Sequence, residues 1–138
     1  MKYHVLIFAV LLLAAALIAG CSQPATQQPS GTASAAVVKV GVIASLTGPA
    51  SNVGTNMWQS AQVAADKINA DGGVTLKDGS KAQIKLIVGD DESTQTGGQK
   101  AATKLIIDDK VDILVGGYSS AVTSAYEQTI AEYRIPYV

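Results

Sequence analysis

From Val37 onward, short apolar runs alternate with segments of helical periodicity, and this alternation constrains the fold more than any other feature. The run 37–44 is rich in β-branched residues and carries only one charge. Such a nearly continuous apolar run is typical of a strand that is buried on both faces. Further strands are predicted at 84–88, 111–115 and 135–138. Strands separated by helices form βαβ units with right-handed crossovers. The sequence therefore predicts an α/β fold with an open, mostly parallel, doubly wound sheet.

The first predicted helix follows the strand at 37–44 and ends at Asp71-Gly72-Gly73, where glycine supplies the left-handed cap. An apolar stripe at helical spacing gives its expected inner face, which consists of Met57, Ala61, Ala64, Ala65 and Ile68. Trp58 stands one position off this stripe, so a partly buried packing role is expected. Residues 74–83 are predicted to form a short hairpin with its turn at Asp78-Gly79.

Two more helices follow the second and third strands. The second is capped by Ser93 or Thr94 and runs to about Asp109, with an inner face of Ala101, Ala102, Leu105 and Ile106. The third starts at Ser119 or Ser120, and its expected buried face is Val122, Ala125, Tyr126, Thr129, Ile130 and Tyr133. Helices of this kind cover both faces of a parallel sheet.

The N-terminus has the features of an export signal. One basic residue, Lys2, precedes a nearly unbroken apolar stretch from Val5 to Ala19. This stretch is shorter than the roughly 20 apolar residues of a membrane-spanning helix. Residues 1–20 are therefore predicted to be a signal peptide. Residues 21–36 are uncharged and rich in Pro, Ser, Thr and Gln, which indicates a flexible linker.

The segment Ile18-Ala19-Gly20-Cys21 resembles the lipobox of lipoproteins. The resemblance implies that Cys21 receives a diacylglyceryl group and becomes the mature N-terminus. Two acyl chains give a stable anchor, so an extracytoplasmic protein tied to the cell membrane is expected. The alternative is an ordinary signal peptide followed by a chance cysteine.

Composition excludes several classes of function. After removal of the signal, nine basic and eleven acidic residues remain without a basic cluster, so no nucleic-acid partner is expected. Cys21 is the only cysteine and His4 the only histidine, which leaves no internal disulfide, His-based triad or His metal site. No GxSxG motif is present. The sequence predicts a protein that is not an enzyme and carries no metal or other cofactor.

In open parallel sheets, ligands bind beyond the carboxyl ends of the strands. Three predicted loops meet there, at 46–54, 90–94 and 116–120. The third is the strongest candidate, because Gly117 permits close backbone approach and Ser119 and Ser120 open a helix whose free N–H groups favour an anion. The alternative is that one of these serines is only an N-cap.

Two other loop motifs are weaker candidates. Thr47-Gly48-Pro49 could place backbone amides beside a ligand, or could be an ordinary turn. Asp90-Asp91-Glu92 invites comparison with a metal site, but three consecutive acids do not converge on one ion. These carboxylates are expected to be solvated charges at a strand end.

Several motifs together resemble the type I periplasmic solute-binding proteins, and most closely the branched-chain amino acid and amide-binding branch that serves ABC importers. The matching stretches lie in order along 37–138 and include 46–49, 64–74, 115–120 and 135–138. The resemblance implies that this region is the N-terminal lobe of a two-lobed protein that closes on a small solute. Permease subunits of the importer are then the expected protein partner.

The resemblance also implies site residues. Ser120 is expected to bind the carboxylate of the solute, an amino acid or amide, with help from Gly117, Tyr118, Ser119 and Thr47. Val53 stands where the family often has an aromatic residue. Because one lobe supplies half a cleft, the 138 residues are expected to be an incomplete lobe that binds amino acids weakly. The alternatives are the ligand-binding module of an extracellular sensor and a small hydrolase or flavodoxin-like carrier.

Overall fold

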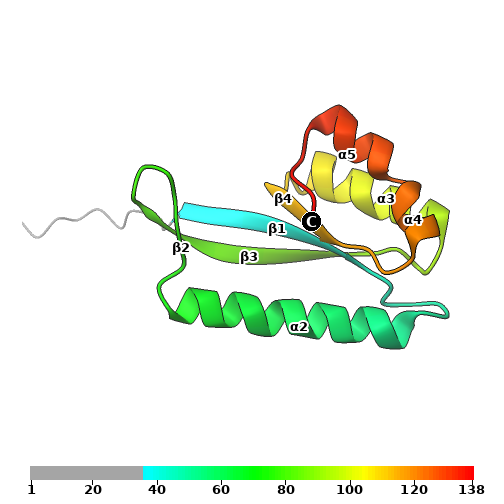
Figure 1. The fold of residues 1–138 in the computed structure, drawn as a ribbon, viewed down its shortest axis with the longest axis horizontal. Coiled ribbons are helices and arrows are strands. Elements are labelled where there is room, and N and C mark those ends of the chain that lie inside the picture. Colours follow the sequence, from blue (N-terminus) through cyan, green and yellow to red (C-terminus); the bar gives the residue numbers. More distant parts are fainter. Residues whose placement is uncertain (1–35) are drawn as a thin grey trace, which may run out of the picture. The chain divides into compact units, whose positions relative to one another are not determined.

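The computed structural model describes residues 36–138 (Figure 1), and its helices and strands follow the predicted order. The predicted signal peptide, Cys21 and nearly all of the predicted linker lie outside the described residues. The elements are β1 (Ala36–Ala44), α2 (Ser51–Ala70), β2 (Val74–Thr75), β3 (Lys81–Asp90), α3 (Gln95–Thr103), the π-helical turn η1 (Lys104–Asp108), β4 (Ile113–Gly116), α4 (Ser120–Ser124) and α5 (Glu127–Tyr133). Within this part of the chain, no helix is both long and apolar enough to cross a bilayer.

The four strands form one open sheet in the order β2-β3-β1-β4. β1 lies in the middle and runs parallel to both β3 and β4, while the short β2 pairs antiparallel with β3. Helix α2 covers one face, and α3, α4 and α5 cover the other (Figure 1). The predicted doubly wound, mostly parallel sheet is confirmed, and so is the hairpin at 74–83.

The main core lies between the sheet and the face that carries α3, α4 and α5. β1 contributes Ile43 and β4 contributes Leu114, both fully buried. The helices add residues that the periodicity predicted to face inward, namely Ala102, Leu105, Ile106, Val122, Tyr126 and Ile130. The predicted cap of the second helix is also confirmed, because the Thr94 side chain accepts a hydrogen bond from the Gly97 N–H at 2.9 Å.

The predicted inner face of α2 is wrong in part. Ala65 is buried, but Ala64 is exposed and Ile68 is 36% exposed. Two contacts determine which face of α2 points to the sheet. Buried Gly54 packs against the backbone of Ser45. The side-chain amide of Asn69 accepts from the Ile84 N–H at 2.7 Å and donates to the Ile84 carbonyl at 2.8 Å. A glycine contact and a polar contact thus fix the orientation of α2 about its axis, and the spacing of apolar residues does not predict either contact.

The third predicted helix is divided in two. α4 ends at Ser124 and α5 begins at Glu127, with Tyr126 fully buried at the junction. The break directs Tyr133 outward, where it is 50% exposed, so its predicted burial is wrong. The chain after α5 pairs in parallel with β4 through a single bridge between Leu114 and Tyr137, which confirms the expected strand only as a short contact.

Candidate ligand-binding site

A cavity of about 330 Å³ lies where the loops after β1, β3 and β4 meet. Its lining residues are Ser45, Pro49, Ala50, Val53, Ser93, Tyr118 and Ser119. A larger hollow of about 730 Å³ lies along α2, but α2 and its C-cap supply all of its lining residues. The cavity at the strand ends draws polar and apolar groups from three separate loops, as expected of a ligand site in a parallel sheet.

Asp90, the last residue of β3, holds the loop that follows β1. Its carboxylate accepts hydrogen bonds from the Leu46 N–H at 2.9 Å, and from the Thr47 N–H at 3.2 Å and hydroxyl at 2.8 Å. It also accepts from the Glu92 N–H at 2.8 Å. Partial burial disfavours the charged form, but these hydrogen bonds outweigh it and hold the pKa of Asp90 below its ordinary value. Asp90 is therefore an ionised bridge between two of the three loops.

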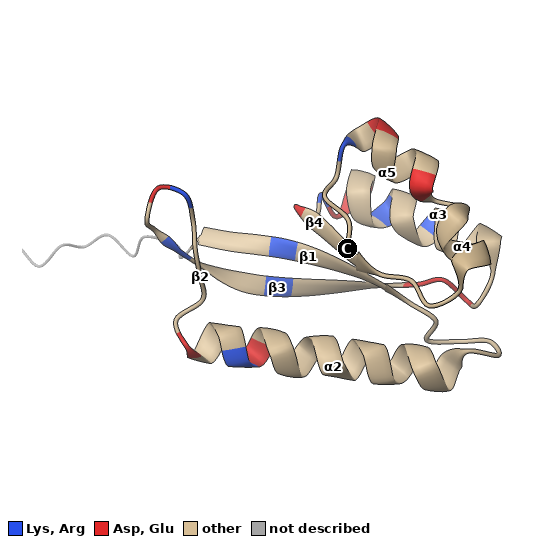
Figure 2. Ribbon diagram, viewed as in Figure 1, with Lys and Arg blue, Asp and Glu red and all other residues tan. Residues whose placement is uncertain are grey.

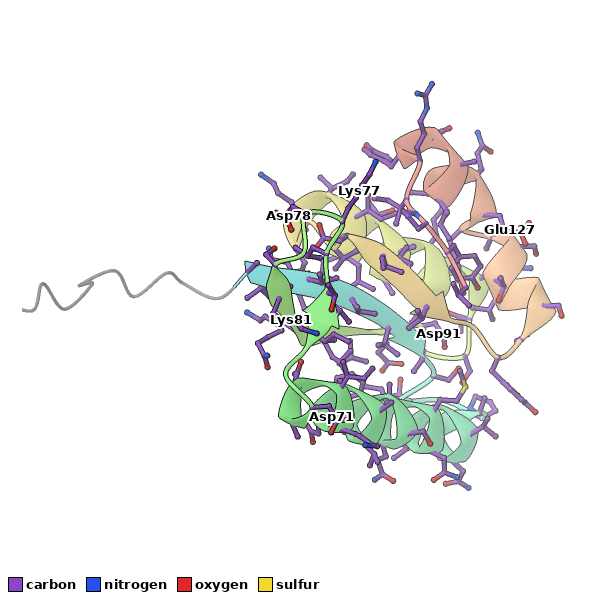
Figure 3. The ribbon with its side chains drawn as sticks, turned by 60° about the vertical axis from the view of Figure 1, so that its left-hand side comes forward. Asp71, Lys77, Asp78, Lys81, Asp91 and Glu127 are labelled. Atoms are coloured by element: carbon purple, nitrogen blue, oxygen red, sulfur yellow. The ribbon has the colours of Figure 1, made fainter. Side chains whose placement is uncertain are left out.

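Asp91 lies directly behind the wall of the cavity and is fully buried. Its Oδ1 accepts a hydrogen bond from the hydroxyl of Ser45 at 2.6 Å and from the Ser93 N–H at 2.8 Å. Both serines line the cavity. Among residues 36–138, its Oδ2 has no hydrogen-bond partner. Figure 3 shows Asp91 inside the fold, whereas Asp71, Asp78 and Glu127 lie at the periphery.

The expectation that Asp90-Asp91-Glu92 carries only solvated charge is therefore wrong for Asp91, which is fully buried, whereas Asp90 is partly exposed. Figure 2 shows this acidic stretch at the carboxyl end of β3, beside the loop that connects β1 to α2. Glu92 is exposed as expected, but Asp90 and Asp91 both accept hydrogen bonds from backbone N–H groups, and also from the hydroxyls of Thr47 and Ser45 respectively. Within 36–138, no cluster of three or more His, Cys, Asp or Glu residues is arranged to hold a metal ion.

Ser93 completes the wall on the β3 side. Its hydroxyl donates to the Thr47 carbonyl at 2.8 Å and accepts from the Ala50 N–H at 3.1 Å. Sequence reasoning missed Ser45, Ser93 and Asp91 as components of the site. A signal was available in part, because serines and acids at two strand ends are suited to bond each other across a parallel sheet.

The predicted site residues divide into two groups. Val53, Tyr118 and Ser119 line the cavity. The Thr47 hydroxyl is already bonded to Asp90, Gly117 packs against tyrosine hydroxyls, and Ser120 is the exposed first residue of α4. Ser119 occupies the N-cap position of α4, yet its side chain makes no capping hydrogen bond. Its hydroxyl is therefore available to the cavity, although the five-residue α4 contributes little helix dipole.

The fold agrees with the result of comparing the sequence with profiles of protein families. The profile of a family described as periplasmic binding protein matches residues 37–138. The chain belongs to the periplasmic binding protein family. Members of this family bind solutes and act outside the cytoplasm, and several serve ABC transporters. A search of curated protein sequences finds no match.

Solved structures of periplasmic binding proteins share the fold. The branched-chain amino acid transporter substrate-binding protein LivJ of Streptococcus pneumoniae, crystallised with isoleucine, is 30% identical with a TM-score of 0.66. The leucine-binding protein LivK of Thermotoga maritima is 27% identical with a TM-score of 0.62. The matches cover 73% and 72% of this chain, but only 28% and 26% of those proteins.

A third periplasmic binding protein structure supports the fold alone. It is the solute-binding protein of an ABC transporter from Rhodopseudomonas palustris, in complex with 3,4-dihydroxybenzoic acid. It is 24% identical with a TM-score of 0.61, and the match covers 73% of this chain and 26% of that one. Proteins that share this lobe therefore bind chemically different solutes.

Proposed function

We propose that residues 37–138 form the N-terminal lobe of a solute-binding protein that delivers an amino acid or amide to an ABC importer. The cavity at the strand ends is the observation that carries this proposal. Its volume of about 330 Å³ is at the lower end of the roughly 300–1,000 Å³ typical of ligand pockets. The permease subunits of the importer are the proposed protein partner.

The lining of the cavity suits a small aliphatic amino acid. Pro49, Ala50 and Val53 offer an apolar surface to an aliphatic side chain. The hydroxyl of Ser119, which makes no capping hydrogen bond, can donate to the polar end of the solute, whereas those of Ser45 and Ser93 already donate to Asp91 and to the Thr47 carbonyl. None of the lining residues is charged, so a solute carboxylate would be bound by hydroxyl and backbone N–H groups. Ser120, at the start of α4, is proposed to contact that carboxylate from the rim.

A nuclear magnetic resonance titration tests this assignment. We expect millimolar isoleucine or leucine to shift the backbone amide resonances of Val53, Ser93, Tyr118 and Ser119. Affinity should be near the millimolar range, or about 4 kcal/mol of binding free energy, because the cavity encloses a solute from one side only. Acetamide, a simple amide, and 3,4-dihydroxybenzoic acid serve as competing solute classes.

The Ser119→Ala variant should lower the affinity for isoleucine about fivefold, because it removes one hydroxyl from the lining of the cavity. The concentration dependence of the amide shifts measures this affinity. Ser124→Ala is the matched control, since within 36–138 the Ser124 side chain bonds only the Ala121 carbonyl of its own helix, at 3.2 Å. Shifts that cluster on α2, or no shifts with any solute, would contradict the proposed site. Micromolar affinity measured by calorimetry would contradict the expectation of weak binding.

The membrane anchor is a separate part of the proposal. The lipobox-like segment that ends at Cys21 supports lipidation, and residues 22–35 would then tether the lobe to the membrane. Mass spectrometry of the mature N-terminal peptide tests this directly. A peptide that begins at Cys21 and carries the added mass of acyl chains is expected. An unmodified Cys21, or cleavage at another position, would favour an ordinary signal peptide.

A further inference from the structure

Three hydroxyl groups converge on Gly117, immediately before the residues that line the cavity. They belong to Thr123 of α4, to Tyr126 at the junction of α4 and α5, and to Tyr137 in the segment after α5. A methyl group placed on Gly117 would lie 2.5 Å from the Thr123 hydroxyl, 2.6 Å from that of Tyr126 and 2.9 Å from that of Tyr137. The loop therefore rests directly on these hydroxyls, which we call the hydroxyl cluster.

The hydroxyl cluster bonds the backbone of the loop. The hydroxyl of Tyr137 donates to the Gly116 carbonyl at 2.7 Å. The Tyr126 hydroxyl lies 3.3 Å from that of Tyr137 and 3.4 Å from that of Thr123. The two tyrosine rings meet edge to face, with centroids 6.0 Å apart and an interplanar angle of 85°. Among the described residues, the bond from Tyr137 is the only hydrogen bond from the cluster to the loop, whereas the hydroxyls of Tyr126 and Thr123 contact Gly117 without bonding it.

Tyr126 is a rigid support for this arrangement. It is fully buried among the core residues, and that burial raises the pKa of its hydroxyl far above the ordinary value. Tyr126 therefore remains a neutral phenol at physiological pH and can both donate and accept a hydrogen bond. A buried aromatic ring fixed in the core holds its partner in one position.

Three backbone groups of Gly116 and Gly117 are then held by hydrogen bonds. The Gly116 N–H donates to the Val138 carbonyl at 3.1 Å, and the Gly117 N–H donates to the Ile43 carbonyl at 3.2 Å. The bond from Tyr137 satisfies the remaining carbonyl. Both glycines have positive φ, of 115° and 93°, so this turn is a conformation that few other residues adopt. Tyr118 and Ser119, which line the cavity, follow directly.

We propose that Tyr137 is a positioning residue of the ligand site: its hydroxyl, supported by Tyr126 and Thr123, fixes the Gly116–Gly117 turn and thereby the placement of Tyr118 and Ser119. This inference rests on the proposed function, because the placement of these two residues affects solute binding only if the cavity is the solute site. The hydroxyl of Tyr137 contacts the backbone of the loop rather than the lining of the cavity, so its removal changes the geometry of the site and not its composition.

The Tyr137→Phe variant tests the inference, because it removes one hydroxyl and keeps the ring. We expect the amide resonances of Gly117, Tyr118 and Ser119 to move or broaden without any solute present. Affinity for isoleucine should fall about fivefold, the effect of one ordinary hydrogen bond. Tyr133→Phe is the matched control, since Tyr133 is 50% exposed and has no hydroxyl hydrogen bond among the described residues.

A double variant separates positioning from simple stabilisation. Because the Tyr126 hydroxyl makes no hydrogen bond to the loop backbone among the described residues, adding Tyr126→Phe to Tyr137→Phe should lower affinity little further. A purely structural role would lower the unfolding temperature and leave the loop resonances and the affinity unchanged, which would overturn the inference. If the parent chain binds no amino acid, the proposed function fails, and the loop resonances of the solute-free variants still decide whether Tyr137 positions the turn.

Discussion

Gly54→Ala should destabilise the chain by about 3 kcal/mol or more, although alanine is ordinarily the better helix former by about 1 kcal/mol. The new Cβ would lie 2.0 Å from the carbonyl oxygen of Ser45 and 2.4 Å from the carbonyl carbon. Backbone atoms at the end of β1 cannot yield without moving the strand, so α2 must shift away from the sheet. Such a loss is a large share of the roughly 5–15 kcal/mol that stabilises an ordinary domain.

Urea unfolding followed by the fluorescence of Trp58 provides the measurement. Trp58 is the only tryptophan, and it borders a hollow between α2 and β3 together with Ile84 and Leu86. Its emission therefore reports whether α2 is docked. Asn56→Ala is the control on the same helix, because Asn56 is exposed and should tolerate alanine within about 0.5 kcal/mol. Equal stability of the parent and Gly54→Ala would show that α2 does not rest on Ser45.

Asp91→Ala should lower the free energy of unfolding by about 2–4 kcal/mol, because it leaves one buried and one partly buried donor without an acceptor. These donors are the hydroxyl of Ser45 and the N–H of Ser93, which bond the same carboxylate oxygen. Both serines belong to the wall of the cavity, so the isoleucine-dependent shifts should also weaken. Chemical unfolding and the amino acid titration measure the two effects.

Two further variants identify the source of this effect. Asp91→Asn keeps one oxygen for both donors and places an amide NH₂ where Oδ2 has no partner among the described residues, so it should cost less than half as much. Glu92→Gln changes the neighbouring, exposed carboxylate and should leave stability within about 0.5 kcal/mol of the parent. If Glu92→Gln lost as much stability as Asp91→Ala, the loss would come from removing negative charge in this loop rather than from breaking the hydrogen bonds of Asp91.

Much of the fold could be predicted from local pattern. The strand at 37–44, the hairpin at 74–83 and the cap at Thr94 are each encoded within a few consecutive residues. The predicted inner face of the second helix is also buried as its periodicity indicates, although Leu105 and Ile106 lie in the π-helical turn η1 rather than in α3. The candidate cavity was predictable in position, since parallel strands place their following loops at one edge of the sheet.

The failures have a common physical origin. The rotation of α2 depends on Gly54 and Asn69, whose partners Ser45 and Ile84 lie in strands or loops outside the helix. The break before α5 places Tyr126 over Gly117 and Tyr137 and leaves Tyr133 exposed. Such contacts join residues of different periodic segments. A pattern within one segment therefore does not contain them.

The sequence by itself determined an α/β lobe with a parallel sheet, the likeness to solute-binding proteins, and the three loops that meet at the strand ends. Only the tertiary structure decided which side chains line the candidate cavity. Asp91 changed from an expected solvated charge to a buried acceptor because Ser45, 46 positions away in the chain, donates to it at 2.6 Å. Periodicity records which face of a segment is apolar, whereas a hydrogen bond between two strand ends exists only after the sheet has brought them together.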